Sequence, residues 1–139
     1  MIRSAQRLNV PLTMPANFPF KSLAVCRAVY AIEAEVGQPG AQAFARAVYR
    51  ACFGQGQKIT DIDVLAKAAV AANAPDWAQD TIQLQERLLD QGIKDQLRAV
   101  TDALIARGCW GSPPFIVDED EMFWGNDKRW ELLSFLTGE

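Results

Sequence analysis

The sequence predicts an α+β protein that is mostly helical and carries one short β-hairpin near its C-terminal end. Apolar side chains recur at helical spacing through most of the chain. Two runs of β-branched and aromatic residues, at 114–117 and 121–124, lie close together near the end. With 139 residues, of which 50% are hydrophobic, the chain is long enough for one domain with a core and too short for two.

The opening segment predicts an extended lead-in, with at most one helical turn at residues 4–8. Pro11, Pro15 and Pro19 fall within it, and proline disfavours helix in the residue before it. Beyond this segment the apolar spacing predicts a series of helices. They cover residues 21–36, 40–53, 60–72, 76–89, 93–107 and 126–136.

Turn-forming residues separate these helices. Gly37 and Pro39 end the first helix, Thr60 and Asp61 offer N-capping oxygens to the third, and Gly108 closes the fifth. The hairpin then has strands at 114–117 and 121–124, joined by the acidic turn Asp118-Glu119-Asp120. An isolated two-stranded hairpin is marginally stable in water, so it must pack on helices or on strands that this sequence does not supply.

Charge and hydropathy exclude several classes of protein. The net charge of −3 leaves no basic excess, so we expect no nucleic-acid partner. No apolar stretch approaches the roughly 18 residues of a membrane span, and the N-terminal residues lack the apolar core of a secretory signal. We therefore expect a soluble, cytoplasmic protein with no membrane partner.

The chemistry-bearing residue types are few. The chain has no histidine, which removes the commonest general base and zinc ligand. The acidic hairpin turn offers too few ligands for calcium, so we expect no metal site. The three cysteines are widely spaced and odd in number, which predicts reduced thiols. Cys109 begins a Cys-x-x-Ser sequence, but it follows a helix end, where the helix dipole does not activate a thiol, and a buried thiol is favoured.

Two pairs of residues have alternative interpretations. Ser112-Pro113 is either an ordinary turn between helix and strand or a cis-proline turn whose preceding backbone pairs with an extended peptide. Asn126 and Asp127 either cap the last helix or hold the carboxylate and ammonium of an amino-acid head group.

Aromatic and basic side chains also have alternative interpretations. We expect the aromatic residues near the hairpin to lie in a core more often than to form a platform for a planar ligand. We expect the basic residues on the helices to lie on solvated faces. The aromatic residues are Trp110, Phe123, Trp124 and Trp130, and the basic ones are Lys21, Arg27, Arg46 and Arg50.

Residues 108–113 and 123–129 resemble the Gly-x-x-Gly-x-Pro turn and the Phe-Trp-Gly-x-Asp-Arg segment of the 2-hydroxychromene-2-carboxylate isomerase family. That family is related to kappa-class glutathione transferases and DsbA-type disulfide oxidoreductases. Upstream, residues 10–19 resemble the family's lead into its helical insertion, and residues 48–56 with 62–65 resemble the stretch that follows. The resemblance covers nearly all of the chain.

The resemblance implies a DsbA-like thioredoxin fold, with residues 18–107 as a helical insertion and residues 108–139 as the C-terminal half of the thioredoxin-like part. It also implies a glutathione-dependent cis/trans isomerase of a small aromatic carboxylate, usually a homodimer. In such proteins the residue before the cis proline, here Ser112 before Pro113, pairs with the cysteinyl part of glutathione. The helix start after the hairpin, here Asn126 and Asp127, holds the γ-glutamyl group.

The chain departs from the family at its beginning. Family members start with a βαβ unit that carries the catalytic Ser or Cys, and such a unit takes roughly 30 or more residues. We expect this chain to lack that unit, so its catalytic residue is unknown and the chain alone is expected to be inactive or weakly active. The alternatives are a non-enzymatic helical module, which dimerises or joins a chain that supplies the missing strands, and thiol redox chemistry at Cys109.

Overall fold

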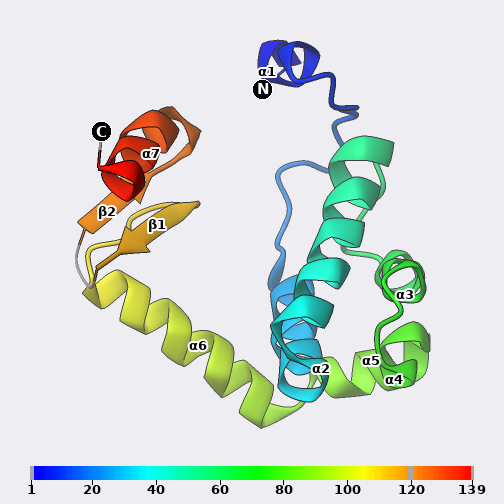
Figure 1. Cartoon of the computed structure of the whole chain (residues 1–139). Coiled ribbons are helices and arrows are strands. Elements are labelled where there is room, and N and C mark those ends of the chain that lie inside the picture. The colour runs from blue at the N-terminus through cyan, green and yellow to red at the C-terminus, as the bar shows by residue number, and fades with distance from the viewer. Residues whose placement is uncertain (1, 119–120, 139) are drawn as a thin grey trace. The chain divides into compact units, whose positions relative to one another are not determined.

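Helices and two short strands make up the described part of the chain, residues 2–118 and 121–138 of a computed structural model (Figure 1). The predicted mostly helical α+β class is confirmed, and in the described residues no strand precedes β1. The elements form two compact units, Met1–Leu97 and Arg98–Glu139, with the division inside α6 (Gln91–Ala106). The single domain and the helical insertion at residues 18–107 both remain predictions, because this division into two units tests neither of them.

The first unit is helical. After α1 (Ile2–Arg7), the long helix α2 (Leu23–Tyr49) continues into a short π-helical turn, η1 (Arg50–Gly54). The predicted break in α2 is present at Gly37, whose φ of 73° and ψ of 179° are not helical. Pro39 then falls in the first turn of the second segment, where its missing N–H leaves no bond unmade.

The remaining helices of this unit are α3 (Ile62–Ala71), α4 (Asp76–Gln79) and α5 (Thr81–Leu88). The prediction of one continuous helix over 76–89 is wrong, because Asp80 interrupts it with an extended backbone. The Asp80 Oδ1 accepts hydrogen bonds from the N–H groups of Ile82 (3.0 Å) and Gln83 (2.9 Å). This side chain thereby caps a new helix and competes with continuation of the old one.

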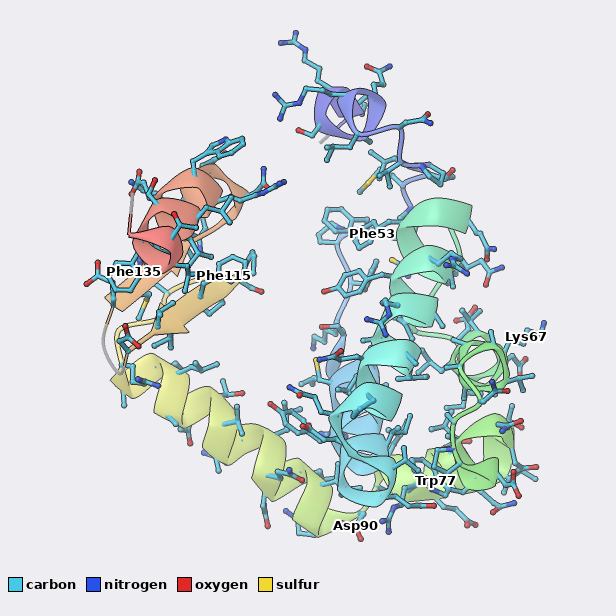
Figure 2. All side chains as sticks on the ribbon, viewed as in Figure 1. Phe53, Lys67, Trp77, Asp90, Phe115 and Phe135 are labelled. Carbon is cyan, nitrogen blue, oxygen red and sulfur yellow. The ribbon has the colours of Figure 1, made fainter. Side chains whose placement is uncertain are left out.

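The core of the first unit lies where α2, α3 and α5 meet. Its largest fully buried side chains are Ile32, Phe44, Cys52, Leu65 and Leu84. A hydrogen bond adds to this packing at the edge, where the Trp77 indole N–H of α4 donates to Glu35 Oε2 of α2 at 2.7 Å (Figure 2).

The second unit carries the hairpin. Strands β1 (Pro114–Val117) and β2 (Glu121–Trp124) pair antiparallel with Phe115 opposite Phe123, so both predicted strands are confirmed. Residues 119 and 120 of the expected acidic turn lie outside the described residues. The predicted last helix begins as a 3₁₀ turn, η2 (Asn126–Lys128), and continues as α7 (Arg129–Thr137).

Candidate functional site

The Ser112-Pro113 turn and the start of the last helix lie side by side at one end of the hairpin. The Ser112-Pro113 peptide bond is cis, in agreement with the cis-proline interpretation of this turn. The Pro113 carbonyl oxygen accepts a hydrogen bond from the Gly125 N–H at 2.9 Å, one residue beyond the paired Pro114 and Trp124. Ser112 and Pro113 are therefore brought next to Asn126.

Two glycines allow this close arrangement. Gly125 has a φ of 76°, a conformation that L side chains rarely adopt, and it turns the chain from β2 into the helix. A Cβ at Gly111 would lie 2.6 Å from the Trp124 indole nitrogen, so the ring passes directly over this residue. Trp110 stacks at a tilt on Trp124, with 4.3 Å between ring centroids.

Polar groups around this turn have no partner within the described residues. The Ser112 backbone N–H and C=O make no backbone hydrogen bond there. The N-cap residue Gly125 has no side chain to satisfy the first N–H groups of the helix. The exposed side chains of Asn126 and Asp127 make no hydrogen bond or ion pair in the described part. The arrangement can accept an extended peptide beside Ser112, together with an ammonium group at the Asp127 carboxylate.

The aromatic residues around the hairpin differ from expectation. Phe123 is buried, but Trp110 is 75% exposed and Trp130 is 73% exposed. Trp124 is also exposed, at 38%. The prediction that the tryptophans belong to a core is therefore wrong for all three, because no element of the second unit covers them. The Trp110–Trp124 pair instead offers a flat apolar surface beside Gly111.

The cysteines occupy three different surroundings, and all three are free thiols. Cys109 is half-buried, and its Sγ lies 3.8 Å from the Met122 Sδ. It follows α6 and donates its backbone N–H to Leu104 O, so it lies just beyond the C-terminal end of a helix and not at a helix N-terminus. Burial raises the pKa of the Cys52 thiol, which lies in the helical core.

Potential metal-binding side chains are scattered in the residues that the structure covers. No group of three or more potential ligands among His, Cys, Asp and Glu comes together in this part of the chain. Over the same residues, no helix combines the length and the apolar character that crossing a bilayer demands.

The family model of the DSBA-like thioredoxin domain matches residues 1–136. The chain belongs to this family of DsbA-like thioredoxin domains.

Within that family, the sequence is similar to proteins named 2-hydroxychromene-2-carboxylate isomerase. The protein of this name from Sphingobium xenophagum is 34% identical over 134 residues, which cover 96% of this chain and 63% of the relative. The protein from Pseudomonas putida is 27% identical over 132 residues, covering 95% and 60%. The isomerase family recognised in the C-terminal motifs is thereby confirmed.

A solved 2-hydroxychromene-2-carboxylate isomerase structure has a similar fold. It superposes with a TM-score of 0.80 at 27% identity, over 99% of this chain and 62% of that one. The chain thus spans about three fifths of the length of the relatives that it matches.

Proposed function

We propose that this chain contributes half of the glutathione site of a glutathione-dependent cis/trans isomerase, acting on a small aromatic carboxylate such as 2-hydroxychromene-2-carboxylate. The observation that carries the proposal is the Pro113 O to Gly125 N–H hydrogen bond, which joins the Ser112 turn to the Asn126–Asp127 helix start. The names of the relatives support the reaction type.

The residues around the turn fit glutathione. The unpaired Ser112 backbone groups suit its cysteinyl backbone, which would pair as an added strand does. The unpaired Asp127 carboxylate suits the γ-glutamyl ammonium, and the N–H groups at the helix start suit the γ-glutamyl α-carboxylate. One short stretch of chain therefore offers a partner to each of these three groups.

When bound, glutathione supplies a thiol whose thiolate adds reversibly to a conjugated carbon, so that the adjacent bond can rotate. Trp110 and Trp124 provide an apolar wall on which the aromatic part of a substrate can stack. The catalytic hydroxyl or thiol is proposed to come from the strand–helix–strand segment that the family resemblance puts ahead of the matched region. We further propose that the assembled protein is a cytoplasmic homodimer, a state that sedimentation of the purified protein tests.

Calorimetric titration with glutathione tests the half-site. We expect Asp127→Ala to weaken binding about tenfold or more, because a hydrogen bond to a charged group contributes about 1.5–3 kcal/mol. Asp102→Ala is the matched control, since it removes an exposed carboxylate from α6 and should leave the affinity unchanged. Binding that Asp127→Ala leaves intact, or the absence of binding heat, rejects the glutathione half-site.

A second candidate function is that of a non-enzymatic binding module. It is favoured by the many exposed apolar side chains of the second unit, and by the hairpin, whose strands pair only with each other in the described part. We propose that the strand–helix–strand unit implied by the family resemblance pairs with this hairpin. The relatives are longer than this chain.

One reconstitution separates the two candidates. The strand–helix–strand segment of the Sphingobium xenophagum relative is expressed apart and mixed with this chain. If the mixture forms a complex and isomerises 2-hydroxychromene-2-carboxylate only when glutathione is present, the enzyme is supported. A complex that binds but does not isomerise supports the binding module, and a failure to associate contradicts both.

A further inference from the structure

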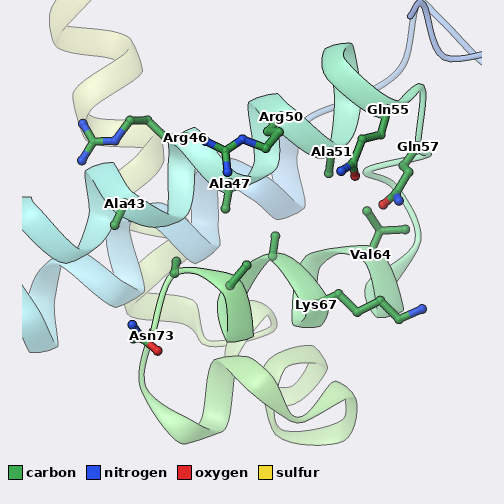
Figure 3. A pocket seen from close by; sticks show the side chains of 13 residues that line it. Ala43, Arg46, Ala47, Arg50, Ala51, Gln55, Gln57, Val64, Lys67 and Asn73 are labelled. Carbon is green, nitrogen blue, oxygen red and sulfur yellow. The ribbon is translucent and has the colours of Figure 1, made fainter. Parts of the chain in front are cut away.

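A cleft of about 460 Å³ lies in the first unit, between α2 with η1 on one side and α3 on the other (Figure 3). This volume falls within the range of small-molecule sites, roughly 300–1,000 Å³. All of its lining residues fall between Ala43 and Asn73. It shares no residue with the Ser112–Asp127 half-site, and neither proposal depends on the other.

The floor of the cleft is apolar and made of small side chains. Both helices contribute alanines to it, and Val64 adds a larger apolar side chain near one end. The alanines are Ala43, Ala47, Ala51, Ala68, Ala71 and Ala72. Because methyl groups project little from a helix, they leave a shallow apolar surface that suits a flat molecule.

The rim of the cleft carries positive charge. Arg46, Arg50 and Lys67 line it, and no Asp or Glu does. In the described part of the chain none of these three cations forms an ion pair. Arg50 lies along α2 beside Ala47 at the rim, whereas Arg46 and Lys67 extend toward opposite ends (Figure 3). Arg46 and Arg50 are exposed, as the sequence predicts, and they also border the apolar floor of the cleft.

The wall beside Arg50 is held by backbone hydrogen bonds. Gln55 and Gln57, which bring amide groups to the cleft, follow η1 directly. The Gln57 N–H donates to Ala51 O at 2.9 Å, and the lead-in segment is tied to η1 where the Thr13 N–H donates to Phe53 O at 2.6 Å. These bonds hold the backbone that carries Gln55 and Gln57 at the edge of the cleft.

We propose that this cleft binds a small planar aromatic carboxylate, with Arg50 pairing its carboxylate and the alanine floor receiving its ring. A guanidinium matches a carboxylate in a two-point hydrogen bond, and the amides of Gln55 and Gln57 can donate to the same group. An inorganic phosphate fits less well, because it brings no ring to cover the alanine floor.

The probe is 1-naphthoate, titrated into the ¹⁵N-labelled full chain and followed by NMR. We expect shifts in the amides of residues 43–73 and a loss of affinity of about tenfold or more in Arg50→Gln. Ala71→Leu should weaken binding without a change of charge, because it fills the cleft from an exposed position on α3. Arg50→Lys should bind with intermediate affinity, since it keeps the charge and loses the fork geometry.

Arg3→Gln is the matched control, because it removes an equal charge from the exposed helix α1 and should leave binding unchanged. 1-Naphthalenemethanol tests the need for the carboxylate, and inorganic phosphate tests the need for the ring. The proposal is overturned if either of these two binds as tightly as 1-naphthoate. It is equally overturned if Arg50→Gln keeps full affinity or if millimolar 1-naphthoate shifts no amide in the cleft.

Discussion

The two units of the chain differ in how far their apolar side chains are buried. In the helical unit Phe44 and Ile32 are completely buried, and a continuous core surrounds them. In the described residues of the second unit Phe123 is the one buried apolar side chain, and large residues such as Trp110 and Trp130 face solvent. A helical bundle can bury its own core, whereas a lone hairpin with a helix cannot. The second unit therefore has the character of part of a larger sheet.

The largest expected effect breaks the core of the helical unit. Phe44→Ala should lower the free energy of unfolding by about 3–5 kcal/mol, because it removes a fully buried ring and leaves a cavity. Phe115→Ala in β1 is the matched change in the second unit, where the ring is 41% exposed, and it should cost about 1 kcal/mol or less. Urea denaturation measures both changes, and equal losses would contradict the contrast between the units.

Thiol reactivity sharpens the same contrast. Iodoacetamide should modify Cys52 about tenfold or more slowly than Cys26 or Cys109, because Cys52 lies in the core and its raised pKa keeps it protonated. Mass spectrometry of timed samples measures the three rates. If Cys109 does not react at neutral pH, thiol redox chemistry at that residue is rejected, and if Cys52 reacts as fast as Cys26, the core is not closed.

The Cys52 thiol also makes stability depend on pH. Because its pKa is higher in the folded chain than in the unfolded chain, its neutral form favours folding below the ordinary thiol pKa of about 8.5. The free energy of unfolding should therefore fall as the pH rises above that value. Cys52→Ser should remove this part of the fall in the free energy of unfolding at alkaline pH. Cys26→Ser is the control and should leave that part of the fall in place.

Local chemistry explains which elements could be predicted from the sequence. The strands were predicted at their observed bounds, because β-branched and aromatic runs are flanked there by Pro113 and Asp118. The break at Gly37 follows from a glycine followed closely by a proline. The side-by-side placement of Ser112 and Asn126 also follows from the sequence, since antiparallel pairing returns the second strand to the start of the first.

Most of the features that were missed depend on packing between distant segments. The exposure of Trp110 and Trp130 is set by what covers them, and no pattern along the chain contains that information. The cleft that Arg50 lines forms only where α2 and α3 pack together, so no pattern along the chain shows that these exposed cations border an apolar surface. Asp80 was missed for a local reason, because an aspartate within an apolar helical pattern can either face solvent or cap a new helix.

A smaller effect is expected from the cap that divides α4 from α5. Asp80→Ala should lower the free energy of unfolding of the helical unit by about 1 kcal/mol. The reason is that the Ile82 and Gln83 N–H groups, which donate to this carboxylate, lose their acceptor. Asp76→Ala is the control, since this exposed carboxylate at the start of α4 makes no side-chain hydrogen bond in the described part of the chain. Urea denaturation should rank Asp80→Ala well above the control, and a reversed order would contradict the capping role.

The smallest effect is expected at the surface of the second unit. Lys128 Nζ lies 2.6 Å from Glu131 Oε1, but both side chains are more than half exposed. Solvent screens such a pair, so Lys128→Ala should change the protection of α7 amides against hydrogen exchange by only about 0.5 kcal/mol or less. Added salt should reduce that difference further. A loss of α7 protection above about 1 kcal/mol would mean that other residues shield the ion pair from water. The contrast between a buried helical core and an exposed hairpin unit would then not hold.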